Sequence, residues 1–229
     1  MTFLKHQNIK IKPTFASCLL PLASCIMTFY PELNNLNLSQ LIERFQKQPL
    51  EGEDASIYYS EIALLISQQG EQGFEYLYES INSADQERLR GIIVALTESQ
   101  TKTEKLRKLL IRYLDDQRPM IVAEAIDGLS KLEEKHAIDH VLVMLDHSSP
   151  YVRGSVLRFL ARLYPEQALP QLLDKLKDPH FIVRENAVDE LDELGIPTVV
   201  PCLDAVAHGG NPQDRAASLF KTTFVRSSS

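Results

Sequence analysis

Apolar residues recur along this chain in a pattern that repeats every 31 positions. In the best copy, which starts at Val152, apolar residues follow four, five, eight and eleven positions later. That spacing places them on one face of a helix and does not fit the alternation of a half-buried strand. Each copy is therefore expected to form an amphipathic helix.

The neighbouring copies keep the same apolar columns. A second apolar stretch follows each copy after a few polar or turn residues, at residues 136–145, 166–176 and 198–206. Each unit is thus predicted to be a pair of short antiparallel helices that buries its apolar faces by stacking on the next unit. The earlier copy supplies Ile121, Ala125, Ile126, Leu129 and Leu132, and the later copy supplies Val183, Ala187, Val188, Leu191 and Leu194.

Short polar joints that contain Asp and Pro separate the units, at residues 115–119, 146–150 and 177–179. Asp or Ser in a joint is expected to cap the next helix, and Pro favours a first helical turn. Gly195 is expected to end a helix, because glycine readily adopts the left-handed conformation found at that place.

Weaker copies extend the pattern in both directions. Residues 57–66 and 73–81 are expected to form a degenerate first hairpin, residues 36–45 a leading helix, and residues 214–219 the start of a further unit. Terminal units need a polar outer side, so imperfect copies are expected there. The pattern predicts an all-α fold, an α-solenoid or armadillo-type superhelix of about five helical hairpins. Its concave face is expected to be lined by the second helix of each hairpin.

The two ends of the chain fall outside this pattern. Residues 27–225 are expected to form the repeat domain, and residues 226–229 a short tail. Residues 1–26 combine three lysines with an apolar run, which resembles a signal peptide, and residues 22–25 match the lipobox of bacterial lipoproteins. The run is short and interrupted by Pro21, so we expect a disordered or spurious extension and a cytoplasmic protein, with an export signal as the alternative.

Charge narrows the choice of partners. The net charge is −7, and outside residues 1–26 there are 21 basic residues against 31 acidic ones. Such a surface repels phosphate backbones, so no nucleic acid is expected to bind. No stretch reaches the length of a membrane span, so no membrane partner is expected either. A basic or neutral protein suits this surface better, although plain solubility also explains the charge.

The joints carry a resemblance to a known family. The Asp-to-Val-Arg spacing, followed by Ala and Leu at helical intervals, resembles HEAT-like repeats, in particular the short variety of phycobilisome lyase subunits and their cyanobacterial relatives. The joint before Val122 departs from it, because valine stands where arginine is expected. The resemblance covers about residues 52–225 and is specific for fold, but weak for activity. Its carriers are Asp146 with Val152 and Arg153, and Asp178 with Val183 and Arg184.

Arginine recurs once per period, at Arg153, Arg184 and Arg215. One interpretation is a basic ladder that grips a partner's carboxylates. The other is that each arginine pairs with a joint aspartate of its own or a neighbouring unit and braces the stack.

An acidic run follows Arg184 on one of the best-defined repeats. It is usual for such a run to be only a solvated helix face, but its position also makes it a candidate contact patch for a partner. The candidate partner-binding residues are Arg153, Arg184, Glu185, Asp189, Glu190, Asp192 and Glu193.

Motifs for chemistry are missing from the sequence. His136 and His140 have the spacing of two metal ligands on one helix face, but no third ligand follows at useful spacing, so no metal site is expected. There is no Gly-rich phosphate loop, no Gly-x-Ser-x-Gly elbow and no Cys-x-x-Cys. Deoxyhypusine hydroxylase, a catalytic family with HEAT-like repeats, binds iron through His-Glu pairs, and no His here is followed by Glu. No catalytic residue is predicted.

Two functions remain open. The first is a non-catalytic scaffold or adaptor that binds another protein on its concave face and needs no cofactor. The second follows from the resemblance alone: a phycobilin lyase-type subunit that holds a bilin tetrapyrrole and assists its attachment. In that case the partner is a phycobiliprotein or a second HEAT-like subunit.

Overall fold

The computed structural model describes residues 29–99 and 103–196, and all regular structure in those ranges is helical. The predicted α-solenoid is confirmed. After a 3-10 turn at Pro31–Asn35, the helices are α1 (Leu38–Gln46), α2 (Ala55–Ser67), α3 (Glu71–Ser80), α4 (Gln86–Glu98), α5 (Glu104–Tyr113), α6 (Pro119–Lys131), α7 (Ile138–Leu142), α8 (Pro150–Leu163), α9 (Pro165–Lys175) and α10 (Phe181–Glu193).

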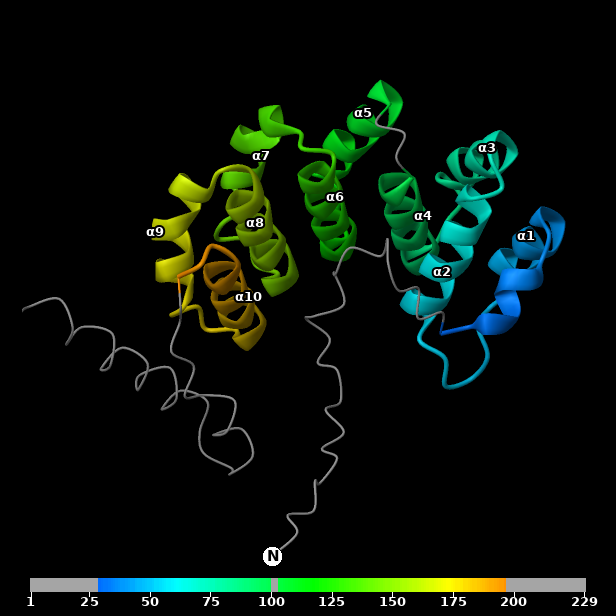
Figure 1. Cartoon of the computed structure of the whole chain (residues 1–229), viewed down its shortest axis with the longest axis horizontal. Coiled ribbons are helices and arrows are strands. Elements are labelled where there is room, and N and C mark those ends of the chain that lie inside the picture. Colours follow the sequence, from blue (N-terminus) through cyan, green and yellow to red (C-terminus); the bar gives the residue numbers. More distant parts are fainter. Residues whose placement is uncertain (1–28, 100–102, 197–229) are drawn as a thin grey trace, which may run out of the picture.

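The helices form two rows along an arc (Figure 1). The even-numbered helices, α2 to α10, form the inner row on the concave side, and the odd-numbered helices form the outer row. The expectation that the second helix of each hairpin lines the concave face was therefore wrong, because the first helix lines it. Each inner helix packs on the next along the row. Close packing along one row and wider spacing along the other curve the stack toward the closely packed row.

The apolar columns form the contacts between inner helices. In α8, Val152, Val156, Leu157 and Leu160 are fully buried. The equivalent positions in α6 and α10 are also buried, with the exception of Val188, which is half-buried at the end of the described stack. The repeat therefore identified the core of the stack correctly from sequence.

The joints form as predicted in one respect and differently in another. Pro119 and Pro150 begin α6 and α8. Ser149, however, makes no side-chain cap hydrogen bond. The joint aspartates act one step earlier: Asp116 Oδ1 accepts the backbone N–H of the residue two positions on at 2.8 Å, and Asp178 Oδ1 does the same at 2.9 Å. These residues shape the turn before the helix, as Asp side chains do in loops.

The weaker repeats differ in detail from the pattern. The stretch at 136–145 forms only a 3-10 turn, Lys135–Ala137, and the short helix α7.

Gly195 ends α10 with φ +73°, as expected. Within residues 29–99 and 103–196, no helix is long and apolar enough to cross a membrane. The expectations for residues 1–26, 198–206, 214–219, Arg215 and 226–229 lie outside the described residues.

Candidate functional site

Arg153 is part of the stack. Its Nε and Nη2 donate to the two carboxylate oxygens of Asp178 at 2.8 and 2.7 Å, and its Nη1 donates to the carbonyls of His147 and Ser148. Only 11% of the Arg153 side chain and 3% of the Asp178 side chain are exposed. Burial by itself raises the pKa of Asp178, but the hydrogen bonds from Arg153 and a backbone N–H bring it below its ordinary value. This arginine braces the stack by binding the aspartate of the next joint.

Arg184 occupies the equivalent place one unit later, with a different set of partners. Its Nη1 donates to the carbonyls of Asp178 and Pro179 at 2.7 and 3.0 Å, which reproduces the carbonyl contacts of Arg153. Among the described residues, no carboxylate reaches its Nε or Nη2. The two arginines that the sequence placed in one column therefore differ.

A network of charged residues links the inner helices. Arg158 in α8 donates from Nη2 to Asp127 of α6 at 2.7 Å and from Nη1 to Asn186 of α10. Arg90 in α4 donates to Glu124 of α6 at 2.9 Å. Burial raises the pKa of Glu124, and Arg90 opposes this shift. Each inner helix from α4 to α8 is thus joined to its neighbour by an ion pair.

Sequence reasoning missed Arg158, although the sequence contained a signal for it. Asp127, Arg158 and Asp189 stand 31 residues apart, so charges of alternating sign occupy one column of the repeat. Opposite charges at equivalent places in stacked units are expected to meet across the helix interface. Only the first two form an ion pair in the structure.

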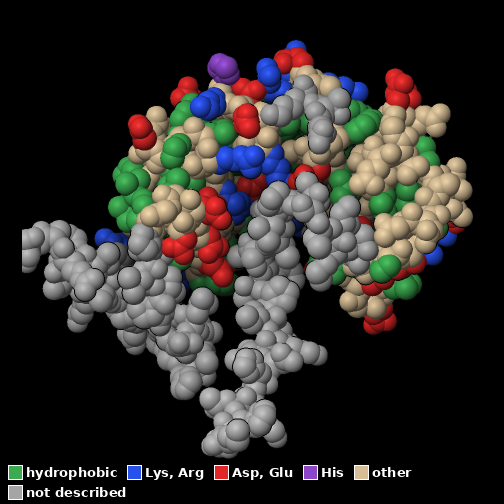
Figure 2. Space-filling view, viewed as in Figure 1, with side chains coloured by type: hydrophobic (Ala, Val, Ile, Leu, Met, Phe, Trp, Pro, Cys, Tyr) green, Lys and Arg blue, Asp and Glu red, His purple; other side chains and the backbone are tan. Residues whose placement is uncertain are grey.

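The acidic run lies on α10, where Asp and Glu side chains gather (Figure 2). Glu185 and Glu190 are half-buried, and Asp189, Asp192 and Glu193 are exposed. Among the described residues, no ion pair is formed by the four carboxylates that we call the acidic face of α10. These four are Glu185, Asp189, Glu190 and Glu193.

Three carboxylates of the acidic face have raised pKa values, so their surroundings disfavour the ionised form. Burial and the neighbouring Asp189 raise the pKa of Glu185, and burial with Asp192 and Glu193 raises that of Asp189. Burial raises the pKa of Glu190 to about 7, against the attraction of Arg158 and together with repulsion from nearby carboxylates. Arg158 opposes the shift of Glu190 by charge attraction without an ion pair, because its N–H donors bind Asp127, Asn186 and Ser155. A cation brought to this face would stabilise all four carboxylates.

Three His, Cys, Asp or Glu side chains that could hold a metal ion do not come together in residues 29–99 and 103–196. His136 is 97% exposed, and its Nδ1 lies 3.1 Å from Glu134 Oε1. A shallow hollow of about 400 Å³ lies at the last described joint, lined largely by charged side chains such as Asp146, Lys175 and Asp178.

Comparison with known proteins supports the repeat. Residues 138–220 match the family of HEAT repeats. Over 118 residues the chain is 32% identical to the AP-3 complex subunit delta of Schizosaccharomyces pombe, and this match covers 46% of the chain and 14% of that protein. The chain thus corresponds to a small part of that relative's length. The chain is an α-solenoid whose residues 138–220 are similar to HEAT repeats, and the particular resemblance to phycobilisome lyase subunits stays a prediction.

Proposed function

We propose that this chain is a non-catalytic scaffold that binds a basic segment of another protein at the α10 end of its concave face. One observation carries the proposal: ion pairs join the inner helices from α4 to α8, and among the described residues none joins α8 to α10. The acidic face presents four carboxylates to whatever lies beyond. Lysine or arginine residues of a partner would supply the missing counter-charges.

Electrostatics adds a property to this proposal. Glu190 has its pKa raised to about 7, so it is partly protonated at neutral pH. A basic partner favours the ionised form, and binding therefore releases a proton. Affinity is expected to rise as the pH increases from about 6 to 8 and to fall with salt, because half-exposed charges are screened.

The comparisons support a role of this kind. HEAT repeats form the binding surface in many unrelated proteins. The relative in Schizosaccharomyces pombe is by its name a subunit of a complex. A place in a multi-protein assembly is our proposal for this chain, and a cytoplasmic location stays a prediction from the sequence. The phycobilin lyase-type subunit also stays a prediction. Its signature would be covalent bilin on an apo-phycobiliprotein, dependent on this chain.

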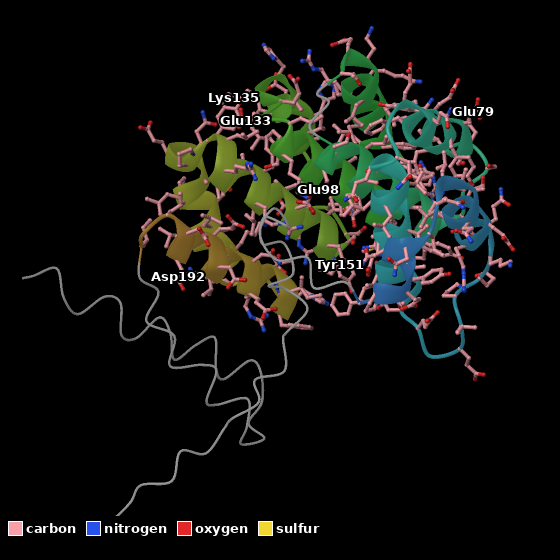
Figure 3. All side chains as sticks on the ribbon, turned by 45° about the vertical axis from the view of Figure 1, so that its right-hand side comes forward. Glu79, Glu98, Glu133, Lys135, Tyr151 and Asp192 are labelled. Atoms are coloured by element: carbon pink, nitrogen blue, oxygen red, sulfur yellow. The ribbon has the colours of Figure 1, made fainter. Side chains whose placement is uncertain are left out.

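The proposal is tested by quantitative capture from a lysate of the source cells on the immobilised full chain. The variant Glu185→Gln/Asp189→Asn/Glu193→Gln removes three charges from the acidic face. The matched control, Glu71→Gln/Glu75→Gln/Glu79→Gln, removes three exposed charges from α3 in the outer row. Glu79 projects from the far end of the stack relative to Asp192 of α10 (Figure 3).

The expected result is a protein whose capture falls about 10-fold or more with the α10 variant and stays unchanged with the control, since hydrogen-bonded charges contribute about 1.5–3 kcal/mol. Equal capture by both variants would show that the acidic face is only a solvated surface.

A further inference from the structure

The contacts of Arg153 show which contacts are expected at Arg184, the equivalent residue of the next unit. Arg153 uses Nη1 to hold two carbonyls of its own joint, six and five residues earlier, and uses Nε and Nη2 to hold the carboxylate. Arg184 repeats the first half of this arrangement, with Nη1 on the carbonyls six and five residues earlier. The guanidinium of Arg184 is therefore held in place. Among the described residues, no carboxylate binds its Nε–Nη2 edge.

The sequence does not supply the second half at the equivalent position. Asp178 stands 25 residues after Arg153, and the residue 25 after Arg184 is Gly209, followed by Gly210. An earlier joint lacks the arginine, and the side chain of its aspartate, Asp146, is 88% exposed. Val122 replaces the arginine there, and Asp146 is instead bound by Lys175 Nζ at 2.6 Å. No such substitute reaches Arg184 among residues 29–99 and 103–196.

The surroundings of Arg184 offer a second contact. Phe181 lies one helical turn earlier on α10, its side chain is 61% exposed, and its ring stacks on His180 at 5.1 Å. An exposed aromatic ring beside a fixed guanidinium is a combination that binding surfaces favour.

We infer that Arg184 is a carboxylate-binding position for a partner protein, whose Asp or Glu takes the place that Asp178 takes on Arg153. The partner segment presents an apolar side chain next to that carboxylate, which packs on Phe181. Arginine suits this role because its planar fork binds a carboxylate through two parallel hydrogen bonds, and a guanidinium already held in place loses little entropy on binding. The inference goes beyond the acidic face and does not depend on it.

The test is NMR of the arginine Nε–Hε groups in the full chain, with a probe taken from the chain itself. The probe is the peptide Leu-Lys-Asp-Pro-His-Phe, which has the sequence of residues 176–181. In the structure the aspartate of this segment, Asp178, binds Arg153. The control peptide carries Asn in place of Asp. Arg162, an exposed arginine of α8, serves as the internal reference.

The aspartate peptide is expected to shift the Arg184 Nε–Hε signal and to leave Arg153 and Arg162 unchanged. The asparagine peptide is expected to bind about 10-fold more weakly or worse, and Arg184→Lys to lose the response. Equal effects of the two peptides would overturn the inference.

A further arm separates a partner's carboxylate from the chain's own. Asp204 and Asp214 are the acidic residues that follow residue 196. In the free chain, the Arg184 signal is expected to be unchanged by Asp204→Asn/Asp214→Asn. If this double variant instead removes an ion-paired signal like that of Arg153, the chain fills the position itself and the partner site is rejected.

Discussion

α8 and α10 come from equivalent positions of the same repeat, yet their charges behave differently. In α8, Arg153 binds a joint aspartate, and Arg158 joins the helices on both sides. In α10, among the described residues, Arg184 binds no carboxylate and the acidic face forms no ion pair. A residue that recurs in each repeat therefore has no fixed role. Its role depends on whether the neighbouring unit supplies the complementary group.

The ion pair of Arg153 and Asp178 should matter most for stability. Arg153→Met leaves Asp178 buried without its counter-charge, so the free energy of unfolding should fall by about 3–5 kcal/mol. Arg162→Met removes an exposed arginine from the same helix and should change stability by less than about 0.5 kcal/mol. Urea unfolding measures both. A small loss for Arg153→Met would mean that the pair does not brace the stack.

Glu190 gives a smaller effect that depends on pH. Its folded-state pKa, about 7, lies above the ordinary value of 4.5, so between these pH values the folded state binds a proton that the unfolded state does not. Stability therefore falls as pH rises from about 5 to 8. Glu190→Gln removes this pH dependence. Over that range the free energy of unfolding of the wild type should fall by on the order of 1–2 kcal/mol relative to the variant, after allowing for solvent screening. Glu75→Gln on α3 is the control, and parallel stability curves for Glu190→Gln and wild type would contradict the assignment.

The sequence predicted the helices and core of the inner row because each apolar column is a local, periodic feature. Leu160 and its equivalents were placed in the core from spacing alone. The direction of curvature was mispredicted, because it depends on how closely the two rows pack, which no single column records. The joint aspartates were expected to cap helices, but they shape the preceding turns.

The sequence predicted which residues recur in the repeat, but not the contacts that each of them makes. The Arg column was found by spacing, but the different partners of Arg153 and Arg184 depend on the contents of the next joint. Arg158 was not predicted because the charges in its column alternate in sign, whereas the repeat is defined by positions whose residue type stays the same. Comparing charges between units, as well as apolar residues, would have found it.

Hydrogen–deuterium exchange of the full chain, with and without the captured partner, tests the proposed binding surface most directly. We expect the partner to slow exchange at α10 and to leave the outer-row helices α3 and α5 unchanged, and we expect the α10 charge variant to lose this protection. Protection confined to the outer row, or to α4 and α6 without α10, would contradict the claim that the unpaired charges of α10 are the binding surface.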